Sequence, residues 1–235
     1  MPGHIFFKVG LYDAALDVAQ RSVAMDYADI DCCHPGFYAA TRYYHEHNVD
    51  FLLYALTETG HLRDAIEVAK REDDSVFMAR QFLTDRQWRA VLSVPYTKGH
   101  SDTVAFARGI AFAELGDFAS AKQSLAEMPK ASADSPSWFD TVGAMRLTLQ
   151  ATIAGREGDS AREIALLQRA GELADQGDHL TYAEFPALYF YSPHLALADA
   201  ATAAGQMLVA RRALRAELAM NPNSPIVAKR LAQLR

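Results

Sequence analysis

The sequence predicts an all-α chain that folds as an α-solenoid of about five antiparallel helix pairs, with extra helices between some pairs. Three observations favour this fold class. Ala, Leu and Arg are abundant and β-branched runs are scarce, which is typical of helices rather than strands. The prolines stand near proposed helix edges, where they disturb a helix least. The strongest observation is a repeated pattern, a glycine followed five residues later by an alanine, at Gly10–Ala15, Gly60–Ala65, Gly116–Ala121 and Gly205–Ala210.

The pattern has a physical meaning at the turn between two helices. A helix often ends on a residue with positive φ, which glycine adopts without a steric clash of a β-carbon. The alanine is expected where the two antiparallel helices approach closely and a small side chain is required. A fifth, degenerate turn is expected around Gly155–Gly158. No linker rich in Gly, Ser or Pro divides the chain, which predicts a single domain over residues 1–235.

Hydrophobic spacing and turn residues predict about a dozen helices. The first pair covers residues 2–9 and 12–25, and a polar loop follows from Asp26 to Gly36. Asp73–Ser75 and Asp134–Ser137 supply N-caps for the helices that follow them. The remaining helices are expected at 38–59, 62–72, 76–92, 103–115, 118–128, 137–154, 160–175, 193–204, 207–220 and 225–234.

These turns resemble those of the tetratricopeptide repeat, in which antiparallel helices meet at a Gly…Ala turn and an Asx-Pro pair follows the second helix. Asn221-Pro222 matches that ending. The resemblance covers most of the chain and implies stacked helix pairs with a concave groove. The four glycines are 50, 56 and 89 residues apart, whereas the family period is about 34 residues. The excess length implies additional helices or long loops between pairs.

Two segments also resemble signatures of a large, poorly characterised group of bacterial tetratricopeptide proteins. That group typically carries Met-Pro-Ser-His-Ile-Tyr and Pro-His-Asn-x-His-Phe-Leu. The corresponding segments here are Met1–Phe6 and Glu46–Leu52, with Gly3, Glu46 and Asp50 in place of a serine, a proline and a histidine. Members usually have further repeats upstream, so the resemblance implies that this chain matches their C-terminal half.

Bulk composition excludes several function classes. The chain has 235 residues, half of them hydrophobic, and a formal net charge of −6, which argues against a nucleic-acid-binding surface as the main function. Its two cysteines are adjacent, Cys32 and Cys33, so a disulfide framework is not expected. No apolar run approaches the roughly 20 residues that span a bilayer, and no signal-peptide pattern begins the chain. We therefore expect a cytoplasmic protein without a membrane partner.

The most unusual stretch of the sequence lies within the helix expected at 38–59. Tyr43, His47, Asp50 and Tyr54 follow one another at steps of four, three and four residues, which places them on one helix face. A polar and aromatic stripe of this kind is a candidate binding surface.

Alignment of the Gly…Ala turns relates this stripe to the other helix pairs. Positions 47, 50 and 54 correspond to positions that line the concave groove in tetratricopeptide arrays. The same alignment adds His4 from the first helix pair and Asp199 from the last. The expected ligand groove therefore contains His4, Tyr43, His47, Asp50, Tyr54 and Asp199.

His4, His47 and Asp50 are expected to converge across neighbouring helices, and three interpretations stay open. Two imidazoles and a carboxylate suit a divalent metal such as Zn²⁺ or Fe²⁺. Alternatively, the histidine and the aspartate one turn apart hydrogen-bond to each other and stiffen the groove. In the third interpretation they contact a bound peptide. His45 points about 200° away from His47 on a helix, so one metal ion is not expected to take both.

Two further features bear on function. The aromatic segment with Tyr182, Phe185, Tyr189, Phe190 and Tyr191 either packs as core at the end of the array or receives an apolar ligand. The sequence has no Gly-rich phosphate loop, no nucleophile elbow and no Cys-x-x-Cys pair. Nucleotide, acyl-transfer and redox chemistry therefore lack support.

The leading expectation is a binding or scaffold protein that holds a peptide, a partner protein or a small ligand in its concave groove. The alternative is a metal-dependent enzyme or metal-binding protein with a His/Asp site in that groove, so whether the chain is an enzyme stays open. Ile5, Phe6 and Val9 leave the first helix with an uncovered apolar side. We expect a partner or a second copy of the chain to cover it.

Overall fold

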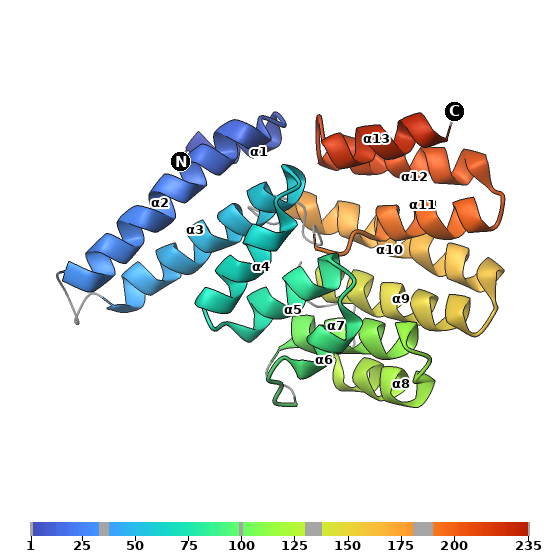
Figure 1. Cartoon of the computed structure of the whole chain (residues 1–235). Coiled ribbons are helices and arrows are strands. Elements are labelled where there is room, and N and C mark those ends of the chain that lie inside the picture. The colour runs from blue at the N-terminus through green and yellow to red at the C-terminus, as the bar shows by residue number, and fades with distance from the viewer. Residues whose placement is uncertain (1, 33–37, 99–100, 130–137, 181–189, 235) are drawn as a thin grey trace.

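The computed structural model describes residues 2–32, 38–98, 101–129, 138–180 and 190–234, and this part of the chain is built from helices and contains no strand (Figure 1). The all-α prediction is therefore confirmed. The helices are α1 (Pro2–Lys8), α2 (Tyr12–Cys32), α3 (Tyr38–Glu58), α4 (Leu62–Arg71), α5 (Ser75–Thr84), α6 (Trp88–Ser93), α7 (Asp102–Glu114), α8 (Phe118–Glu127), α9 (Trp138–Arg156), α10 (Ser160–Leu180), α11 (Pro193–Ala203), α12 (Met207–Met220) and α13 (Pro225–Gln233).

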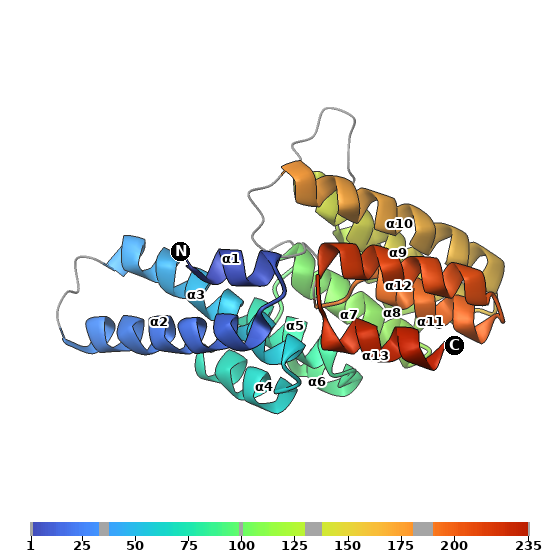
Figure 2. The same cartoon turned by 90° about the horizontal axis from the view of Figure 1, so that it is seen from above.

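The helices follow one another around an arch (Figures 1 and 2). Each helix packs against the next along the chain, and α5, α7, α9 and α11 also pack in series. Six hairpins result, α1–α2, α3–α4, α5–α6, α7–α8, α9–α10 and α11–α12, and α13 packs on α12. We call the helix that opens each hairpin its first helix.

Five of the hairpin turns have the predicted glycine chemistry. Gly10, Gly60, Gly116, Gly158 and Gly205 all have positive φ, between 70° and 95°. In the second turn, for example, the N–H of Gly60 donates to the carbonyl of Thr57 (3.1 Å) and the N–H of His61 donates to that of Leu56 (2.7 Å). These bonds satisfy carbonyls at the helix end. The alanines Ala15, Ala65, Ala121 and Ala210 are completely buried, as the need for close helix approach predicts.

The remaining hairpin turn joins α5 to α6, and it shows that the prediction of a single helix over residues 76–92 is wrong. The chain instead forms two helices, α5 and α6, and Arg86 occupies the glycine position with a φ of 56°. The N–H of Arg86 donates to Leu83 (3.1 Å) and that of Gln87 to Phe82 (2.9 Å), which is the same bonding pattern. Five residues after Arg86, Val91 takes the place of the alanine and is completely buried. The turn escaped the sequence analysis because an arginine there gives no glycine signal.

Helix ends elsewhere differ in two places. α2 continues through Cys32 and replaces the first part of the loop expected from Asp26, and α10 continues through Leu180. The extra turns of α2 are tied to α3, since Asp26 accepts a hydrogen bond from Asn48 (2.9 Å). The predicted N-cap before α5 is confirmed, because Asp74 accepts from the N–H groups of Val76 and Phe77. The predicted cap at 134–137 lies outside the described residues.

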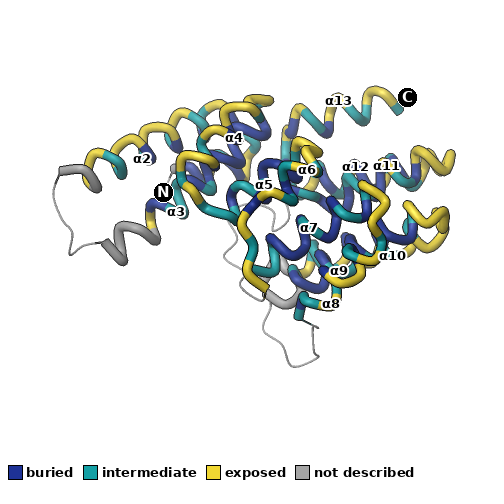
Figure 3. The backbone as a smooth tube through the Cα atoms, turned by 60° about the horizontal axis from the view of Figure 1, so that its bottom comes forward, coloured by how far each residue is buried: buried dark blue, intermediate teal, exposed yellow. Residues whose placement is uncertain are grey.

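The hydrophobic core runs along the whole arch: α7 has no exposed residue, whereas α4 and α12 each keep an exposed side (Figure 3). One large cluster extends from Phe7 on α1 to Ile153 on α9, and a second joins α9 through α13. Among the described residues, no helix combines the length and the apolar character needed to cross a membrane.

The two ends of the arch touch each other. The turn between α12 and α13 lies so close to the α1–α2 turn that a β-carbon on Gly10 would stand 1.9 Å from the carbonyl oxygen of Pro222. The contact also includes the Tyr12 hydroxyl, which donates to the same oxygen over 3.0 Å, although the residues are 210 positions apart in the sequence. The helix array is thus closed on itself, because the tip of its first hairpin touches the turn between α12 and α13.

Candidate functional site

Two of the predicted groove residues are brought together as expected. His4 on α1 and His47 on α3 have ring centroids 5.4 Å apart. Both rings pack edge-on against the buried ring of Phe51, at 4.7 Å and 4.8 Å. The two imidazoles are half-buried, so an aromatic cluster joins the first helices of the first two hairpins.

The third residue of the proposed metal set, Asp50, is bonded to the next hairpin. Its carboxylate oxygens lie 2.9 Å and 3.0 Å from Nη1 of Arg80 on α5. About four-fifths of each side chain is shielded from water, so this charge-assisted bond is made in a partly dry environment. Within the described ranges, no three His, Cys, Asp or Glu side chains are placed to hold a metal ion.

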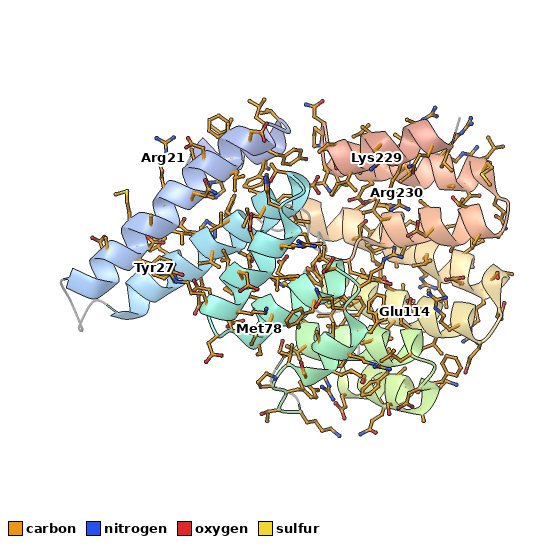
Figure 4. All side chains as sticks on the ribbon, viewed as in Figure 1. Arg21, Tyr27, Met78, Glu114, Lys229 and Arg230 are labelled. Carbon is orange, nitrogen blue, oxygen red and sulfur yellow. The ribbon has the colours of Figure 1, made fainter. Side chains whose placement is uncertain are left out.

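The remaining predicted groove residues lie elsewhere. Tyr54 is 1% exposed, and its hydroxyl donates to the side chain of Asn221 in the last turn. Asp199 on α11 is exposed and pairs with Arg86 (3.0 Å) and with Arg230 on α13, which Figure 4 labels. Tyr43 belongs to α3, but its side chain is outside the described residues. The five predicted residues whose side chains are described therefore do not form one continuous lining.

A short segment before α11 lies on the first helices α5 and α7. The backbone carbonyl of Phe190 accepts from the Thr84 hydroxyl over 2.9 Å. The guanidinium of Arg80 lies 5.0 Å from the centre of the Phe190 ring, and Phe106 contacts both Phe190 and Tyr191 edge-on. Phe190 is 2% exposed. Of the two roles expected for this aromatic segment, packing is confirmed for Phe190; Tyr182, Phe185 and Tyr189 lie outside the described residues.

A buried polar network, absent from the sequence analysis, surrounds the contact between the two ends. It contains two carboxylates, Glu58 on α3 and Glu217 on α12, which are 7% and 4% exposed. Burial raises the pKa of Glu58 to about 7, against the lowering effect of the Ser224 hydrogen bond. Burial also raises the pKa of Glu217. Glu58 gave no sequence signal because its partner Ser224 is 166 positions away. Glu217 is bonded to Ser192 and Asn221, 25 and 4 positions away, but no characteristic spacing of residue types marks these pairs.

A second buried cluster joins α2, α3 and α4. The His45 ring lies between two carboxylates, with Nε2 at 2.9 Å from Glu72 and Nδ1 at 3.3 Å from Asp26. The hydrogen bond to Glu72 raises the pKa of His45 despite burial. Tyr27, labelled in Figure 4, donates to Glu72 and stacks beneath the guanidinium of Arg71. His45 therefore faces α2 and α4, on a different side of α3 from His47, as the helical step predicted.

Comparison with known proteins returns no match. No protein-family model matches the chain, and neither a curated protein nor a solved structure matches it.

Proposed function

We propose that the chain is a tetratricopeptide-like binding protein that holds a segment of a partner protein against the first helices of its hairpins. Support comes from the six hairpins that follow one another with the same turn geometry. Stacked hairpins of this kind present the first helices as a continuous surface, which suits an extended peptide.

The single observation that carries the proposal is the chain's own segment at Phe190 and Tyr191. Its main-chain carbonyl is bound by Thr84, and its aromatic rings are held by Arg80 and Phe106. A hydrogen bond to the peptide backbone combined with a side-chain site is the usual chemistry of peptide recognition. The half-buried side chains of His4 and His47 continue these first helices toward the start of the chain. We assign them as the contact residues for a partner segment.

The test is selection of binding peptides from a random library with the purified full chain, followed by calorimetric measurement of their affinity. His47→Ala should weaken binding about five- to twelvefold, because an aromatic contact of about 1–1.5 kcal/mol is removed. Lys70→Ala on the exposed side of α4 is the matched control and should leave the affinity unchanged. Failure to select any peptide, or equal effects of the two substitutions, would contradict the proposal.

Self-association through α1 is a second part of the proposal. Ile5 is 65% and Val9 47% exposed, whereas Phe6 packs partly against the core. Large apolar side chains grouped on one exposed helix side are typical of an interface. Sedimentation velocity over a concentration series should therefore show a dimer that Ile5→Glu abolishes; a monomer at every concentration would refute it.

The metal-dependent alternative has no specific observation in its favour. Its proposed carboxylate ligand, Asp50, is bonded to Arg80, and two histidines alone do not make a typical protein metal site.

A further inference from the structure

The contact between the two ends of the helix array has an outer layer of neutral hydrogen bonds. The Tyr12 hydroxyl donates to the Pro222 carbonyl over 3.0 Å, and the Asn223 amide donates to the Val9 carbonyl over 3.0 Å. Asn223 itself has a left-handed backbone, with a φ of 60°. The tight turn between α12 and α13 thus presents both its main chain and its side chains to the first hairpin.

The inner layer of the same contact contains the two buried carboxylates. Ser224 donates to Glu58 over 2.7 Å, and it joins residues 166 positions apart. Asn221 accepts from Tyr54 and donates to Glu217 over 2.8 Å. Every one of these residues is less than 8% exposed, so separating the ends would bring water to the Ser224–Glu58 and Tyr54–Asn221 hydrogen bonds.

The charge environment of the two carboxylates decides when the contact is stable. Among the described residues, neither Glu58 nor Glu217 is paired with a lysine or an arginine. The groups that face Glu58 are the hydroxyls of Tyr12 and Tyr54, the Ser224 hydroxyl and Glu217 itself. The electrostatic effect between the two carboxyl groups is repulsive when both are ionised.

Glu217 has a different set of neighbours on its other side. Ser192 donates to it, and His194 on α11 lies close enough to act on its charge. His194 is in turn bound through Nε2 to Asp175 on α10, over 2.8 Å. This basic group therefore shares its charge between two acids and does not neutralise Glu217 alone.

We propose that the contact between the first and last hairpins is a pH-sensitive clasp, closed while Glu58 and Glu217 hold protons and opened when both ionise. The clasp would control the shape of the array, and this proposal does not depend on peptide binding by the first helices. A neutral carboxyl group is tolerated in the dry contact, whereas a carboxylate without a cation gains free energy by moving into water.

The direction of the pH effect follows from the proton count. In the closed array, burial raises the pKa of Glu58 to about 7, while in the open array the same group regains its ordinary value near 4.5. Between these values the closed state binds more protons, so the closing equilibrium weakens as the pH rises. The expected decrease is about tenfold per pH unit for each proton released.

The test measures the distance between the two ends with a pair of spin labels. Cysteines are introduced at the exposed positions Gln20 on α2 and Ala228 on α13, in a full chain with Cys32→Ser and Cys33→Ser. We expect a narrow, short distance distribution at about pH 5 and a longer, broader one at about pH 8. The helical circular dichroism should be the same at both values, which separates opening of the clasp from unfolding.

Glu58→Gln supplies the decisive variant. Its amide stays neutral and its carbonyl still accepts from Ser224, so the ends should remain close at about pH 8. Glu67→Gln on the exposed side of α4 removes the same charge without touching the clasp and should open as the parent chain does. If Glu58→Gln does not fold, Glu217→Gln provides the same comparison. Ends that stay together in the parent chain at high pH, or that separate equally in the two variants, would overturn the proposal.

Discussion

Substitution of Gly10 by alanine tests whether the ends of the array are in contact. All five turn glycines have positive φ, but an added β-carbon meets nothing within 4 Å at Gly60, Gly116, Gly158 or Gly205. At Gly10 it would stand 1.9 Å from the Pro222 oxygen, 2.6 Å from its carbonyl carbon and 2.8 Å from the Asn223 β-carbon. Two of these are backbone atoms, so the last turn as a whole has to move away.

The structure allows an estimate of how much more Gly10→Ala destabilises the fold than Gly60→Ala does. An alanine in the left-handed region costs roughly 1–2 kcal/mol, and the lower entropy of the unfolded chain offsets about 0.4–1 kcal/mol of that. Gly60→Ala should therefore destabilise the fold by about 1 kcal/mol. Gly10→Ala should cost the same and also lose the hydrogen bonds of Tyr12 and Asn223, each contributing about 1 kcal/mol, together with buried bonds behind them. We expect a total of about 3–5 kcal/mol.

Urea unfolding followed by far-ultraviolet circular dichroism measures both free energies under the same conditions. Gly116→Ala serves as a second control, because it has the same backbone conformation and no neighbour. A loss of stability in Gly10→Ala that matches both controls within about 0.5 kcal/mol would show that the ends are not in contact. The clasp would then lose its structural basis as well.

Three further substitutions test individual contacts by the same unfolding assay. Tyr54→Phe should cost about 1–3 kcal/mol, because it leaves a buried acceptor in the last turn without its donor; an effect below about 0.5 kcal/mol would contradict that bond. Arg80→Ala should cost about 1–2 kcal/mol through loss of its carboxylate partner on α3, whereas Arg21→Ala in an exposed pair should have almost no effect. His45→Gln should remove stability that is present below the ordinary histidine pKa of 6.5 and is lost as the pH rises through the raised value. Because the pKa of Glu72 is lowered, the stability that Glu72 contributes is instead lost as the pH falls. Equal pH profiles of Tm for the parent chain and the variant would refute both assignments.

Local patterns in the sequence were sufficient to predict the all-helical class and the approximate positions of most helices. A glycine at each helix end and an alanine at each close approach act over a few residues, so they can be identified without knowledge of distant partners. The Arg86 turn shows the limit of that reasoning. A left-handed arginine is disfavoured on its own, and it is held here by a turn whose other bonds match the glycine turns and by a pair with Asp199.

The candidate site was less predictable for the same physical reason. Spacing placed His4 and His47 on neighbouring first helices, and the structure brings their rings together. The partner of Asp50 could not be predicted, because it belongs to a hairpin that the sequence analysis had treated as one helix. The buried carboxylate of Glu58 depends on Ser224, in a turn near the other end of the chain. No local pattern encodes such a contact.

Closure of the array also constrains how this protein can change its length. Open repeat arrays interact only between neighbours, so units can be added or removed with little effect on the rest. Here Tyr12 reaches Pro222 and Thr84 reaches Phe190 across 210 and 106 positions. Deletion or duplication of one hairpin would move the donor of each of these hydrogen bonds away from its acceptor. The long-range contacts therefore fix the number of hairpins that the array can contain.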